Sequence, residues 1–73
     1  MEQQRMLIKA VDAGWSLEDG LTQALMFLSG AAAERAARDL AQRIAEAGTD
    51  VSISITDRAG DLVSVIHYYA ALF

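Results

Sequence analysis

The stretch AAAERAARDLAQRIAEAGTDVSISIT, residues 31–56, joins a helical repeat directly to a strand repeat. Within residues 31–47, apolar side chains recur at helical spacing on one face, and charged side chains occupy the other. The apolar stripe consists of Ala33, Ala36, Ala37, Leu40, Ala41 and Ile44. Ser29 stands where an N-cap belongs, and Gly48 stands where a glycine ends a helix. We therefore predict a helix over residues 31–47 whose alanine face can lie close against a sheet.

The residues after this helix predict a hairpin. Residues 51–56 (VSISIT) alternate between branched apolar and hydroxyl side chains, which is typical of a half-buried strand. A turn that contains Gly60 follows, and residues 62–69 (LVSVIHYY) predict the returning strand.

The residues before the helix also predict strands. Residues 6–11 (MLIKAV) form a short apolar run, and residues 12–14 (DAG) have turn chemistry. Residues 15–18 (WSLE) alternate in polarity, and the Asp19-Gly20 pair is a strong hairpin signal. Residues 21–28 are then the expected returning strand.

The segment 16–28 has a helical alternative. Ser16 and Asp19 resemble a helix N-terminal box. A helical stripe is formed by Leu17, Leu21, Ala24, Leu25 and Leu28. Gly20 opposes this alternative, because glycine inside a helix costs about 1 kcal/mol relative to alanine. We adopt the strand interpretation and keep the helix as its alternative.

Together these elements predict one α+β domain over residues 1–73. The expected architecture is an antiparallel β-sheet in the order β-β-β-α-β-β, with one amphipathic helix packed on one face. If the helical alternative holds for residues 16–28, the order becomes β-α-α-β-β.

Composition restricts the class of protein. Six Lys and Arg against ten Asp and Glu give a net charge of −4, a poor basis for binding nucleic acid. The chain is 53% hydrophobic, yet its charge-free runs are too short to span a bilayer. It has no cysteine, and the N-terminal residues MEQQRMLIKA lack the pattern of a signal peptide. We therefore expect a cytoplasmic protein that binds neither nucleic acid nor membrane.

Motifs for catalysis, metals or cofactors are weak. His67 is the one histidine and has no second histidine or cysteine with which to hold a metal. Asp57 and Asp61 flank a glycine but fall short of a calcium loop. The glycines do not form a nucleotide-binding pattern, and no serine has an evident base. We expect no enzyme activity and no cofactor.

Several of these residues resemble a family of small bacterial proteins catalogued as a domain of unknown function. The resemblance rests on Gly14-Trp15-x-Leu17, the Asp19-Gly20 turn, Phe27 before Ser29, Ala33…Ala37-x-x-Leu40-Ala41, Gly48 and Asp57-x-x-Gly60-x-x-Val63. It covers residues 14–66 and implies a hairpin–helix–hairpin plan, without an established activity. The chain departs from the family pattern at Ala32, where glutamate is frequent. It also resembles HicB-type antitoxins, which place a hairpin before an alanine-rich helix, although their proline-containing segment is missing here.

The apolar surplus predicts association with a partner. One helix covers one sheet face, so apolar residues on the strands and in the C-terminal run remain uncovered. We expect a non-enzymatic protein-interaction module, homodimeric through its apolar sheet face or its C-terminal strand. The candidate interface residues are His67, Tyr68, Tyr69, Leu72 and Phe73. The alternative is an acidic inhibitor or antitoxin-like protein that neutralises a larger protein partner.

Overall fold

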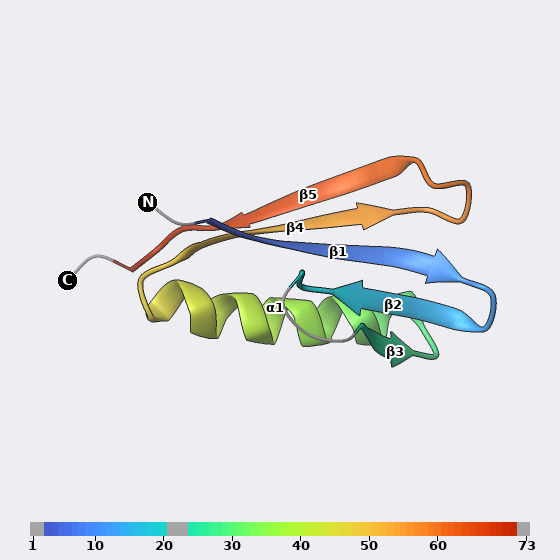
Figure 1. The fold of residues 1–73 in the computed structure, drawn as a ribbon, viewed down its shortest axis with the longest axis horizontal. Coiled ribbons are helices and arrows are strands. Elements are labelled where there is room, and N and C mark those ends of the chain that lie inside the picture. The colour runs from blue at the N-terminus through green and yellow to red at the C-terminus, as the bar shows by residue number, and fades with distance from the viewer. Residues whose placement is uncertain (1–2, 21–23, 72–73) are drawn as a thin grey trace.

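The computed structural model describes residues 3–20 and 24–71, which form a five-stranded sheet and one helix (Figure 1). The elements are β1 (Gln3–Val11), β2 (Gly14–Glu18), β3 (Leu25–Phe27), α1 (Gly30–Glu46), β4 (Asp50–Thr56) and β5 (Leu62–Tyr68). The predicted order of three strands, one helix and two strands is confirmed.

The sheet is mixed, so the prediction of a purely antiparallel sheet is wrong. Its strand order is β3-β2-β1-β4-β5, in which β1 and β4 are parallel and all other neighbours are antiparallel. The chain reverses its direction twice between β1 and β3, so these two strands run in the same direction. The 17-residue helix then carries the chain back along the sheet. As a result β4 starts beside the start of β1, with Asp50 opposite Gln3.

The segment between β1 and α1 is extended where the structure describes it. Leu17 in β2 lies opposite Leu25 in β3, and the two strands are antiparallel. The helical alternative is therefore wrong for the described residues. Gly20 has a φ of 80°, which lies in the left-handed region. A right-handed helix cannot continue through a residue with this conformation.

The two hairpins of this half differ in their turns. Val11 lies opposite Gly14, so only residues 12 and 13 connect β1 to β2. The prediction of a two-residue turn at Asp19-Gly20 is wrong, because β3 begins only at Leu25. Residues 21–23, part of the predicted strand 21–28, lie outside the described residues.

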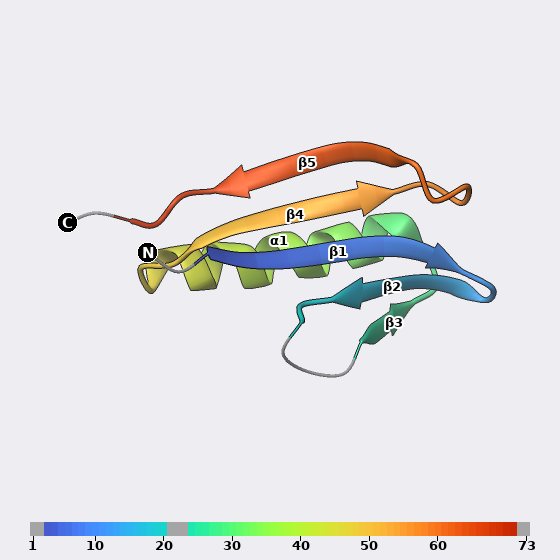
Figure 2. The same cartoon turned by 45° about the horizontal axis from the view of Figure 1, so that its top comes forward.

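Alanines bring α1 close to one face of the sheet. Figure 2 shows α1 behind the middle strands, with β5 along one edge of the sheet and β3 along the other. The buried cluster between the two layers consists of Met6, Ile8, Leu17, Ala33, Ala37, Ala41, Val51 and Ile53. Because alanine has only a methyl side chain, the helix backbone can approach these strands closely.

Both predicted capping residues are confirmed, although the helix spans Gly30–Glu46 instead of the predicted 31–47. The Ala32 N–H donates to Ser29 Oγ at 3.1 Å, which satisfies one of the free donors of the first turn. Gly48 follows the helix with a φ of 105°, and its N–H donates to the Ala45 carbonyl at 3.0 Å.

Candidate functional site

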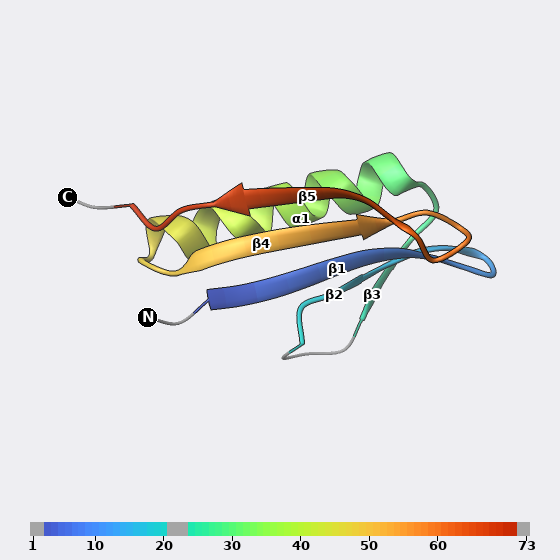
Figure 3. The ribbon, with the colours of Figure 1, turned by 90° about the horizontal axis from the view of Figure 1, so that it is seen from above.

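The outer edge of β5 is the longest free strand edge among the described residues. β5 pairs with β4 on one side only, and no other described strand lies on its second side. In the view from above (Figure 3), β5 lies in front of α1 and no other element crosses it. Its seven residues include no Asp, Glu, Lys or Arg. We call the unpaired side of Leu62–Tyr68, together with the exposed side chains of this strand, the β5 edge.

Large apolar side chains on the β5 edge are exposed. Leu62 and Val63 are each 60% exposed and Val65 is 42% exposed. Leu62 lies opposite Thr56, and Val65 lies opposite Ser54. A slip in register between Ile55 and Thr56 disturbs the ladder near Leu62, and the ladder is regular from there to the end of the strand. Val65 therefore lies on the regular part of the strand, whereas Val63 lies at the slip and has no partner residue in β4.

The side chains of β5 alternate between the helix side and the open face of the sheet. Ile66 lies opposite Ile53, and Tyr68 lies opposite Val51, so both point to the side that α1 covers. Both pack against the buried cluster. Val65 belongs to the other face, which no described helix covers.

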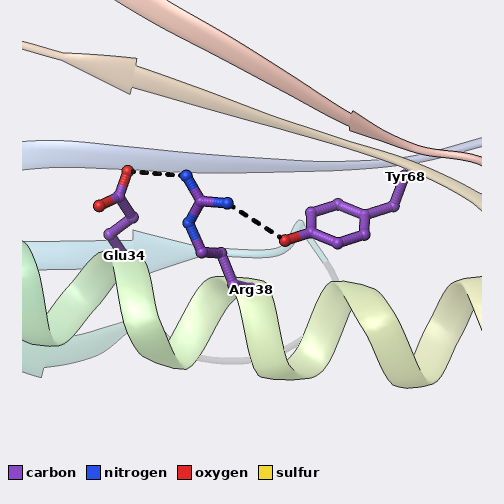
Figure 4. A network of polar contacts seen from close by, with 3 residues as sticks. All are labelled: Glu34, Arg38 and Tyr68. Carbon is purple, nitrogen blue, oxygen red and sulfur yellow. Dashed lines mark hydrogen bonds and ion pairs between the residues drawn. The ribbon is translucent and has the colours of Figure 1, made fainter.

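Tyr68 contributes to the contact between β5 and α1. The Arg38 guanidinium donates to Tyr68 Oη at 3.5 Å and lies 3.4 Å from Glu34 Oε1 (Figure 4). These partners raise the pKa of Arg38 above its ordinary value, and the hydrogen bond to Tyr68 is the largest cause. Of the predicted interface residues, Tyr68 is thus engaged inside its own chain.

His67 and Tyr69 form an exposed aromatic pair. Their ring centroids lie 6.1 Å apart, with 18° between the ring planes. Tyr69 is 75% exposed, and His67 lies opposite Ser52 on the open face. The predicted residues His67 and Tyr69 therefore lie together at the end of the β5 edge.

The chain beyond β5 turns towards the helix. The Ala70 N–H donates to Asp50 Oδ1 at 2.7 Å, and the Ala71 N–H donates to the Ala45 carbonyl at 2.9 Å. These bonds hold the end of the described chain against the C-terminus of α1 and the start of β4. Leu72 and Phe73, the last two predicted interface residues, lie outside the described residues.

The middle of the open sheet face carries polar side chains around the half-buried Leu7. Lys9 Nζ lies 2.9 Å from Glu18 Oε2 on this face. Ser16 and Ser52 are buried there among larger neighbours. The exposed apolar side chains of the described strands therefore gather at the sheet edges rather than at its centre.

A second apolar group lies at the opposite edge of the sheet. Leu25 and Met26 in β3 are exposed, and so is Leu28 just after it. β3 is only three residues long, so it offers a much shorter edge than β5.

The Asp57 side chain is used in local structure. Asp57 Oδ1 accepts hydrogen bonds from the main-chain N–H groups of Ala59 and Asp61, both at 2.9 Å. This Asp side chain therefore shapes the turn between β4 and β5. The described residues include no group of three or more His, Asp or Glu side chains placed to hold a metal ion.

The predicted interface residues all lie after residue 66, and the exposed side chains of Leu62, Val63 and Val65 were not among them. A signal for them was present, because the last strand has no charged residue and its apolar residues outnumber its polar ones. Which strand lies at an edge of the sheet is set by β1 pairing with β4, a contact that local sequence patterns do not report.

Comparison with known proteins gives no relative from which a role could be transferred. No family model, no curated protein and no solved structure matches the chain. Among the described residues, no helix has the length and apolar character needed to cross a membrane.

Proposed function

We propose that this chain is a non-catalytic protein-interaction module that forms a homodimer through its uncovered sheet surface. The observation that carries the proposal is the combination of a free strand edge with exposed apolar side chains at Leu62, Val63 and Val65. Edge strands of soluble proteins usually carry lysine, proline, a β-bulge or a covering element that prevents pairing with another chain. Between Leu62 and Tyr68 there is neither lysine nor proline, and the one register slip lies near Leu62, so the ladder from Ser64 to Tyr68 is regular.

Symmetry favours a second copy as the partner. Every copy presents the same edge, and a two-fold dimer uses that edge on both copies and then closes. Proteins of similar size bury only part of their apolar surface in their own core, and association can bury more.

The assembly state of the purified chain tests this proposal. We expect sedimentation velocity and light scattering to show a reversible dimer at tens of micromolar protein, dissociating to monomer on dilution. A monomer throughout that range contradicts the proposal. In that case the acidic chain, with its net charge of −4, becomes a candidate inhibitor of a larger protein that supplies the missing strand.

A further inference from the structure

We infer that two copies pair antiparallel through β5, with Val65 of one copy opposite Val65 of the other. This inference rests on the proposed homodimer and specifies its geometry. The two five-stranded sheets would then continue into one sheet, with both helices on the same face.

The lengths of the two free edges favour β5. β5 has seven residues, whereas β3 has three and ends close to the helix that follows it. Each residue of a paired strand adds main-chain hydrogen bonds, so the longer edge gains more from pairing.

The charge distribution points to a second copy as the occupant of the β5 edge. The whole chain carries a net charge of −4, so two copies repel each other overall. Residues Leu62–Tyr68 include no Asp, Glu, Lys or Arg, so pairing here places no formal charges of the same sign opposite one another.

The surroundings of the edge leave room for a neighbouring strand. α1 lies behind the middle strands rather than beyond β5 (Figure 2). Ala70 and Ala71 are bonded to Asp50 and to the helix end, so this part of the chain leads away from the free edge.

The faces of the sheet determine the register. Residues directly opposite in an antiparallel pair project to the same face. In a pair of strands related by a two-fold axis, one residue of β5 must therefore lie opposite the same residue of the other copy, at the centre of the paired segment. A centre at Val65, the exposed apolar residue of the regular ladder, pairs residues 63–67 and leaves Leu62 beyond the register slip. It places Ser64 opposite Ile66 on the helix side and Val63 opposite His67.

The size of the contact sets the expected affinity. A seven-residue strand is roughly 23 Å long, and pairing along one edge buries less than the ~800 Å² per partner of a standard interface. We therefore expect a dissociation constant in the micromolar range.

Complementary charges at Val65 test the register. Val65→Lys places two lysines opposite each other and Val65→Glu places two carboxylates opposite each other. Each variant alone should weaken the dimer by about a hundredfold in Kd. An equimolar mixture of the two should restore a heterodimer, measured by sedimentation velocity. Met26→Lys and Met26→Glu are the matched controls, because Met26 is exposed at the opposite edge and should leave the dimer unchanged.

Disulfide trapping gives an independent readout, because the chain has no native cysteine. Opposite residues in an antiparallel pair have Cα atoms about 4.5–5.5 Å apart, within the range of a disulfide. Val65→Cys should therefore oxidise to a covalent dimer. Val63→Cys and His67→Cys should form mainly the mixed dimer when combined. Circular dichroism under reducing conditions checks that each variant is folded.

The outcomes separate this inference from the proposed function. A wild-type monomer overturns both. A wild-type dimer that survives Val65→Lys, or that is trapped by Met26→Cys and not by Val65→Cys, keeps the homodimer and overturns pairing through β5. A dimer that is trapped by Val63→Cys alone, and not by Val65→Cys, overturns the register.

Discussion

At the scale of single residues, Gly14 shows how closely the first two hairpins fit together. Its φ is 156°, and a Cβ at this position would run into the carbonyl oxygen of Phe27 on the neighbouring strand. The adjacent Trp15 ring lies beside Gly30 at the start of α1, where a Cβ would come within 3.2 Å of the ring. Two glycines therefore let β2, β3 and the helix start approach one another.

The clash at Gly14 leads to a prediction about stability. Gly14→Ala should lower the free energy of unfolding by about 2–4 kcal/mol, because the new methyl group meets main chain that cannot move without disturbing the strand pairing. Urea denaturation followed by circular dichroism measures the change.

Gly20→Ala is the matched control for backbone strain. Gly20 also has a positive φ, of 80°, but a Cβ there would meet nothing within 4 Å. The free energy of unfolding of this variant should fall by about 1–2 kcal/mol, the cost of holding alanine in the left-handed conformation. If Gly14→Ala and Gly20→Ala lowered the free energy of unfolding equally, the Phe27 carbonyl would not constrain Gly14.

At the scale of elements, the alanine face of α1 determines how near the helix lies to the sheet. Ala33, Ala37 and Ala41 are completely buried. Their spacing along the sequence predicted the helix and the face it buries, because both follow from a repeat of 3.6 residues. The segment 16–28 was different, since its apolar residues satisfied a helical and a strand pattern at once. The pairing of Leu17 with Leu25 and the left-handed Gly20 decided in favour of strands.

A larger side chain on the alanine face should separate the layers. We expect Ala37→Leu to reduce the free energy of unfolding by about 1–3 kcal/mol, because the added atoms have no space between α1 and β4. Ala31→Leu is the control, since Ala31 is an exposed residue of the same helix and leucine has a similar helix propensity. Its effect should stay within about 0.5 kcal/mol in the same urea titration. Tolerance of leucine at both positions would contradict close packing.

At the scale of the whole molecule, the described residues place one helix on a five-stranded sheet and leave the other sheet face and both edges without a covering element. The centre of the open face carries the Lys9–Glu18 ion pair and buried serines around the half-buried Leu7. The exposed apolar side chains lie instead at the edges, and β5 provides the longer edge. This arrangement is what supports association through an edge rather than through the face.

Association should link stability to protein concentration. For a dimer that unfolds to two chains, each tenfold rise in concentration stabilises the folded state by about 1.4 kcal/mol per mole of dimer. We therefore expect the urea midpoint of the wild-type chain to rise with concentration above its Kd. The midpoint of Val65→Lys should stay constant over the same range. A wild-type midpoint that does not move with concentration would contradict self-association.

Helix, strands and caps could be read from the sequence because each depends on residues near one another in the chain. The alanine stripe, the alternation of residues 51–56 and the positions of Ser29 and Gly48 are signals of this kind. Parallel pairing of β1 with β4, the contact of Gly14 with Phe27 and the open edge of β5 were not readable in this way. Each joins residues that are distant in sequence or depends on which strands become neighbours. The folded chain alone sets those neighbours, because the path of α1 across the sheet places β4 beside β1, and the pairing of β2 with β3 places Phe27 beside Gly14.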